Sequence, residues 1–230
     1  MAITLKSATI TDLDGNSVGV MSNQVVEIVA KTGGQAEVTV DVNGENLQVI
    51  NTENTASTGS VSLDSGSGDI TDLTVDGVSI FDTSSAIADV GDLDLQAFNL
   101  AVAINAYTSS PNYTATVSGD TVTIIADKAL AAGPNGDVVV STTNGTLATT
   151  DSNMASGADV VAALVTAFTS IVTLTTDTGT RYLNALRILS MNPTSDANVT
   201  YMRYDSTGEF AEEINVSDSV ANVIAAVNAL

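Results

Sequence analysis

The chain has 230 residues, of which 27 are Asp or Glu and 6 are Lys or Arg, so its formal net charge is −21, and it contains no Cys, His or Trp. These counts exclude disulfides, thiolate and imidazole catalysis, and the usual zinc, copper and haem ligand sets. They also argue against binding to nucleic acid or to an anionic membrane surface, because both need clustered Lys and Arg.

The apolar content predicts a folded protein built mainly from strands. Hydrophobic residues make up 44 % of the chain and aromatic residues only 4 %, which favours thin layers of Ala, Val, Ile and Leu. The sequence opens on an alternating pattern without a basic and apolar leader, so we expect no secretory signal. The longest apolar stretch, 160–174, is too short and too polar to span a bilayer.

The two ends of the chain resemble each other. Residues 9–20 (TITDLDGNSVGV) and 172–183 (VTLTTDTGTRYL) each indicate a strand, a Gly-containing turn and a second strand. Three further segments, 25–31, 36–42 and 47–56, then match 185–191, 197–204 and 212–221 in that order. We therefore predict two copies of one small β-meander, packed as a single body with pseudo-twofold correspondence.

The segment between the copies predicts a separate α+β module. Copy one ends in a Ser/Gly-rich stretch, 57–69, which is typical of a linker. Two strands are expected around Asp76-Gly77, a helix from Asp92, and hairpins at Gly119-Asp120 and Asn144-Gly145. One face of this helix is predicted to carry Leu95, Phe98, Ala101, Val102 and Asn105. A second helix follows Ser217, with apolar residues at helical spacing.

The predicted fold is thus mainly β with minor α (α+β), with β-sandwich character. Residues 1–57 plus 160–230 form a repeat-built base domain, and 58–159 form an inserted module. The net charges of 1–60, 61–159 and 160–230 are −5, −12 and −4. Because like charges repel, we expect subunits to meet through the base, while the acidic module folds independently and projects into solvent.

Two acidic clusters raise the question of a metal site. One is the turn from Asp12 to Asn16, and the other runs from Asp64 through Asp72 to Asp94. Neither matches a calcium-binding loop, so a linking turn and a solvated sheet face are preferred, although a divalent ion at an oligomer contact stays open. No catalytic residue, metal ligand or cofactor is predicted, and enzyme activity is not expected.

Aromatic and guanidinium groups coincide in one region of the second copy, at Tyr182, Arg187, Tyr201, Arg203 and Tyr204. Such residues are enriched at protein interfaces. Two interpretations stay open: a strand with one wet, cation-bearing face, or a contact with another subunit or a capsid. Under the second, alanine at Arg203 together with Tyr201 should weaken assembly without unfolding the chain.

The middle segment resembles a module that recurs in structural proteins of tailed bacteriophages. The resemblance rests on VDGVSIF, AVAINAYTSSPNYTATVSGDTVTIIA, AAGPNGDVVVSTTNGTLATT and SNMASGAD, in that order. The C-terminal stretch from ALRILSM to VNA looks like a small strand–strand–helix unit of phage virion proteins. The resemblance implies a virion component, made in the host cytoplasm, without catalytic residues.

Three functions are compatible with these observations. The first is a capsid decoration or cement protein that binds the shell through its base, and the second is a tail, neck or baseplate subunit. The third is a cell-surface adhesive or carbohydrate-binding domain, which the missing aromatic platform disfavours. The expected partners are other virion proteins, either the major capsid protein or tail components, and further copies of the chain.

Overall fold

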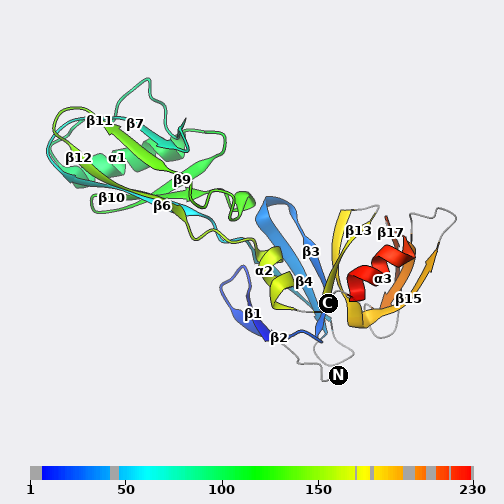
Figure 1. The fold of residues 1–230 in the computed structure, drawn as a ribbon. Coiled ribbons are helices and arrows are strands. Elements are labelled where there is room, and N and C mark those ends of the chain that lie inside the picture. The colour runs from blue at the N-terminus through cyan, green and yellow to red at the C-terminus, as the bar shows by residue number, and fades with distance from the viewer. Residues whose placement is uncertain are drawn as a thin grey trace. The chain divides into compact units, whose positions relative to one another are not determined.

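The computed structural model describes residues 7–41, 47–168, 170–176, 179–193, 200–205, 211–217 and 219–228. It is mainly β with three helices in these residues, and it divides into two compact units (Figure 1). Unit 1 comprises Met1–Glu53 and Val160–Leu230, and unit 2 comprises Asn54–Asp159. The sequence places the first boundary after residue 57, whereas unit 2 already begins at Asn54.

Unit 1 contains two copies of one series of elements. The first copy comprises β1 (Ser7–Thr11), β2 (Ser17–Met21), β3 (Val25–Ala30), the 3₁₀ turn η1 (Thr32–Gly34), β4 (Gln35–Asp41) and β5 (Leu47–Glu53). The second comprises β13 (Ile171–Thr176), β14 (Gly179–Asn184), the 3₁₀ turn η3 (Ala185–Arg187), β15 (Ile188–Pro193), β16 (Thr200–Asp205) and β17 (Ala211–Val216).

A nearly constant offset along the chain relates the two copies. The offset from Val25, which opens β3, to Ile188, which opens β15, almost equals the offset between Asp41 and Asp205, which end β4 and β16. β3 and β15 also carry a β-bulge at the same place, between Val25 and Glu27 and between Ile188 and Ser190. The predicted strand order is confirmed, but 25–31 corresponds to 188–193 and not to 185–191, because η3 precedes β15.

Each copy ends in a helix, and the inserted unit conceals this in the first copy. α3 (Val220–Asn228) packs on β13 and β15. α2 (Val160–Ala167) packs on β1, β3 and β4, although the whole of unit 2 separates it from β5 in the sequence. The repeated series is therefore five strands and a helix, and unit 2 is inserted between the last strand and the helix of copy one.

Each copy has its own small hydrophobic core. Apolar side chains at alternating strand positions point to the helix, as the period of two in a strand requires. The equivalent pairs Ile10 and Leu174, and Val20 and Leu183, show the same offset as the strands. The core of copy one includes Ile10, Val20, Ile28, Val38, Leu164 and Phe168. The core of copy two includes Val172, Leu174, Leu183, Val216 and Val223.

The two copies are joined head to tail. Eight described strands form one antiparallel sheet in the order β15-β16-β17-β13-β14-β3-β4-β5. The hairpin β1–β2 adjoins the far end, where the backbone N–H of Leu13 donates to the carbonyl of Asn51 at 3.2 Å. A pseudo-twofold arrangement that pairs β14 with β3 would also pair their equivalents, β2 and β15. The described strands contain the first pair without the second, so the predicted pseudo-twofold relation is wrong.

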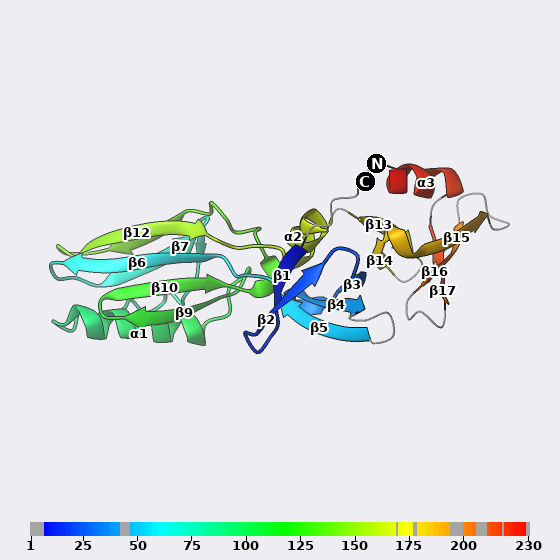
Figure 2. The same ribbon diagram turned by 90° about the horizontal axis from the view of Figure 1, so that it is seen from below.

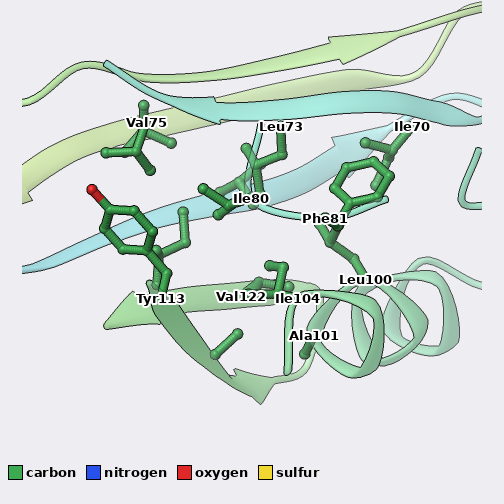
Figure 3. Close-up of a cluster of buried hydrophobic side chains, with 14 of the residues drawn as sticks. Ile70, Leu73, Val75, Ile80, Phe81, Leu100, Ala101, Ile104, Tyr113 and Val122 are labelled. Atoms are coloured by element: carbon green, nitrogen blue, oxygen red, sulfur yellow. The ribbon is translucent and has the colours of Figure 1, made fainter. Parts of the chain in front are cut away.

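Unit 2 is built from two sheets and one helix around a single core. One sheet has the order β12-β6-β10-β9 and the other β11-β7-β8. These strands are β6 (Thr58–Ser65), β7 (Ile70–Val75), β8 (Val78–Ser79), β9 (Tyr113–Ser118), β10 (Thr121–Ala126), β11 (Val139–Thr143) and β12 (Ala148–Ala155). The helix α1 (Leu93–Ala106) lies along β9 and β10 (Figure 2). Figure 3 shows Leu73, Phe81 and Tyr113 converging with side chains of α1.

Two expectations for unit 2 are wrong in detail. The stretch expected as a linker contains β6, in which Val61 and Leu63 are fully buried and Ser60 and Ser62 occupy the alternate, less buried positions. β11 and β12 do not pair at Asn144-Gly145 but join different sheets, with β7 and β6 respectively. On the helix face that the sequence singles out, Leu95, Phe98 and Val102 are about half exposed. The buried face of α1 is Gln96, Ala97, Leu100, Ala101 and Ile104.

Candidate assembly interface

Two of the five predicted interface residues lie where the copies join. Tyr182 pairs with Ile28 across β14 and β3, and its side chain packs against the core of copy one. The guanidinium of Arg187 donates to Asp41 Oδ2 at 2.8 Å. This ion pair is mostly buried, with 14 % and 10 % of the two side chains exposed. Both residues thus have partners in the other copy of the same chain.

The other three predicted residues, Tyr201, Arg203 and Tyr204, lie in β16. Their backbones pair with β15 on one side and β17 on the other, so β16 is an inner strand of the sheet. Their side chains lie outside the part of the chain that the structure describes. Their proposed role in a subunit contact therefore stays a prediction.

The junction also uses residues that the sequence does not single out. Arg181 on β14 forms an ion pair with Glu27 on β3. Asn184 Nδ2 donates to the carbonyl oxygens of Ser22 at 3.0 Å and Val25 at 2.7 Å. Glu27 offers a signal, because it is an acid within the apolar run VVEIVA, and an acid buried there requires a partner.

Unit 1 has four edge strands in the part of the chain that the structure describes. β1 and β5 adjoin each other through the Leu13–Asn51 bond, and β2 and β15 lie outermost. β2 is paired with β1 on one side and β15 with β16 on one side, and no described strand pairs with the other side of either. Gly19 and Met21 on β2 are exposed. An open edge presents unpaired N–H and C=O groups, and it associates readily with another strand.

At two edge strands of unit 2, β9 and β11, side chains of the same unit instead bond to the outward backbone groups. Asn105 on α1 bonds to both the N–H and the carbonyl of Ala115 on β9, each at 2.8 Å. On β11, the N–H of Ser141 donates to Asp151 at 2.8 Å and the N–H of Val139 to Asn153 at 3.3 Å. These contacts occupy backbone groups that another strand would use.

Several motif residues behind the phage resemblance have structural partners. Asn105 belongs to the A-I-N-A end of the helix and fixes the Y-T-A-T strand. Asn135, of the G-P-N-G loop, bonds to the side chain of Ser57 and to both the N–H and the carbonyl of Gly157. Thr55 and Ala158 exchange two backbone bonds of 3.0 and 2.9 Å. The loop thus closes the module where the chain enters and leaves it.

In each acidic cluster, hydrogen bonds hold one Asp in place. Asp12 accepts hydrogen bonds from the side chain and the N–H of Asn16, which lower the pKa of Asp12. Asp69 accepts from the N–H of Asp89 and the side chain of Asn144, which lower the pKa of Asp69. No group of three or more acidic side chains among the described residues is arranged to hold a metal ion.

Two small cavities lie on the described surface. One of about 330 Å³ lies between the β1–β2 turn and β5, and one of about 380 Å³ lies beside α1, near Asp82 and Tyr107. Neither of these two is lined by a Lys or an Arg. Among the described helices, none has the length and apolar character needed to cross a bilayer.

Searches for similar proteins found no match among protein-family models, curated proteins or solved structures.

Proposed function

We propose that the protein is a non-enzymatic structural subunit of a tailed-bacteriophage particle, and that it assembles with copies of itself through unit 1. The observation that carries this proposal is the head-to-tail arrangement of the two copies in unit 1, whose outermost described strands, β2 and β15, lack an outer neighbour. In unit 2, by contrast, side chains cover the edges of β9 and β11. The assignment to a tailed-phage particle rests on the resemblance of residues 75–159 to a module of phage structural proteins.

Head-to-tail contacts favour a ring-forming role. Such contacts are heterologous, and they close into a ring when the rotation from one copy to the next divides a full turn. Rings of identical subunits suit a tail, neck or baseplate component, which is the second of the sequence-based hypotheses. The head-to-tail arrangement makes it the leading proposal.

Capsid decoration is the second candidate, and the charge distribution favours it. Unit 2 carries thirteen acidic residues and one basic residue, Lys128. Such a unit repels its own copies and stays solvated, as expected of a module on the outside of a shell. In this case unit 1 would contact the major capsid protein.

Fractionation of virions distinguishes the two candidates. Virions of the phage that encodes the chain are disrupted, and heads and tails are separated and quantified by mass spectrometry. We expect the chain in the tail or neck fraction in a fixed ratio to known ring proteins. Recovery with heads, in hundreds of copies, would favour decoration, and absence from both fractions would refute a virion role.

A further inference from the structure

The internal junction of unit 1 provides a template for a contact between chains. In the sheet, β14 is the strand of copy two that borders copy one, and it pairs with β3. The equivalents of these strands, β2 and β15, are the edge strands with no described neighbour on their outer side, whereas the edges of β1 and β5 adjoin each other. We propose that β2 of one chain pairs antiparallel with β15 of the next, which repeats between chains the junction found within each chain.

This proposal rests on the proposed function, since it names the partner as a second copy of the chain. It also fixes a register. Within the chain, Tyr182 faces Ile28. The offset between the copies makes Gly19 the equivalent of Tyr182 in β2, and Met191 the equivalent of Ile28 in β15. Gly19 of one chain should therefore lie opposite Met191 of the next.

The surroundings of both strands suit such a contact. A Cβ added at Gly19 would meet no atom within 4 Å, so there is room on that face of β2 beside the side chain of Met191 of the next chain. Val20 and Met191 pack toward the cores of their own copies, as Leu183 and Ile28 do at the internal junction. A β2–β15 pair would thus extend the sheet with each apolar residue already on its buried face.

The two junctions differ in charge. The internal junction contains the ion pairs Arg181–Glu27 and Arg187–Asp41. In the contact between chains, Val18 and Ser190 take the places of the first pair, and Gln24 and Asp205 take the places of the second. Neither substitute pair joins opposite charges, and each chain carries a net charge of −21. Salt should therefore promote assembly by screening repulsion.

A cysteine pair tests the contact directly, because the natural chain has no Cys. The full-length variant Gly19→Cys with Met191→Cys is assembled at high salt and treated with an oxidant or a short bismaleimide. We expect a ladder of covalent multimers on denaturing gels, with most of the chain above the monomer. For the oxidised sample, reduction should return it to monomer.

Matched variants distinguish the proposed β2–β15 contact from cross-linking within one chain and from a twofold contact. The variant Tyr182→Cys with Ile28→Cys places cysteines at the equivalent internal pair. It should cross-link within one chain, so the protein should still run as a monomer on denaturing gels. Gly19→Cys alone and Met191→Cys alone should give no covalent dimer. A dimer from either single variant would show a twofold contact, and an assembled protein whose double variant gives no ladder would lack this pairing. Either result overturns the proposal.

A charge exchange covers the case in which cysteines disturb folding. Gly19→Lys with Met191→Lys should leave monomers in sedimentation, and Gly19→Lys with Met191→Glu should restore multimers, with circular dichroism confirming the fold of both. Multimers of equal size from both variants would contradict the contact. Cross-linking through β2 and β15 in a chain absent from virions would refute the proposed function while leaving this contact intact.

Discussion

The two units differ in the edge strands of their sheets and in the number of their hydrophobic cores. Unit 2 has a single core shared by both sheets and α1, and its own side chains bond to backbone groups at the edge strands β9 and β11. Unit 1 has two smaller cores, which a strand pair and ion pairs join, and its described edges at β2 and β15 are open. A further strand could therefore extend the sheet of unit 1 at β2 or β15, whereas side chains of unit 2 obstruct such pairing at β9 and β11.

The largest expected effect separates the folding of the two units. Gly68 has a φ of +149°, and a Cβ there would clash with the backbone carbonyl of Asn144, at the turn where the chain changes sheets. Gly68→Ala should destabilise unit 2 by more than about 3 kcal/mol, because backbone must move. Calorimetry should show the unit 2 transition lost or lowered, with the unit 1 transition unchanged.

Gly77→Ala is the matched control for Gly68→Ala. Gly77 also has a positive φ, +78°, but open space surrounds it. Only the backbone preference is then violated, which costs about 1–2 kcal/mol. Equal losses for the two variants would show that crowding at the sheet change is unimportant. A simultaneous loss of both transitions would show that the two units do not fold independently.

The junction between the copies is the corresponding weak point of unit 1. Arg187→Ala leaves the largely buried carboxylate of Asp41 without this charge partner. We expect a loss of about 2–4 kcal/mol in the free energy of unfolding of unit 1, because an uncompensated charge is costly away from water. Lys31→Ala, which breaks the exposed pair with Glu37, should cost less than about 1 kcal/mol. Chemical denaturation monitored by circular dichroism measures both, and similar losses would contradict a structural role for Arg187.

Much of this architecture is predictable from strand patterns, and the exceptions have physical causes. The two copies, the hairpin at Asp76-Gly77 and the N-cap Asp92 follow from short-range signals, and Asp92 does accept from the N–H of Leu95. The equivalence of α2 and α3 does not, because unit 2 separates α2 from the rest of its copy. β6 has the composition of a linker, which hides the alternation of its buried residues.

The candidate interface is less predictable than the fold. Tyr182 and Arg187 belong to residue types common at interfaces, and their partners lie within the chain. No sequence rule distinguishes a contact between repeats of one chain from a contact between chains, since both draw on the same residue types. The order of strands in the sheet, which reveals the open edges, depends on long-range pairing that local patterns do not encode.

Removing an edge cover in unit 2 should make it resemble unit 1. Asn105→Ala removes the side chain that bonds to the N–H and carbonyl of Ala115. We expect a loss of about 1–2 kcal/mol in unit 2 and concentration-dependent self-association through β9. Sedimentation of the isolated fragment 54–159, with its unmodified sequence as control, measures both effects after circular dichroism shows that the fragment folds. A monomeric variant at every concentration would show that Asn105 only stabilises the helix.

The smallest expected effect is a loss of unit 2 stability in alkali. Tyr113 is almost completely buried in the unit 2 core (Figure 3), and burial, with the nearby charges of Asp137 and Asp76, raises the pKa of its hydroxyl above its ordinary value. The raised pKa belongs to the folded state, so the stabilisation is fully present below about pH 10, the unfolded value. It is lost as the pH rises through the folded value, because only the unfolded chain ionises readily. Tyr113→Phe should therefore flatten the decline in the unit 2 melting temperature above about pH 10, whereas Tyr182→Phe, in unit 1, should leave that decline unchanged. An identical decline in the parent and Tyr113→Phe chains would mean that another group governs the alkaline unfolding of unit 2.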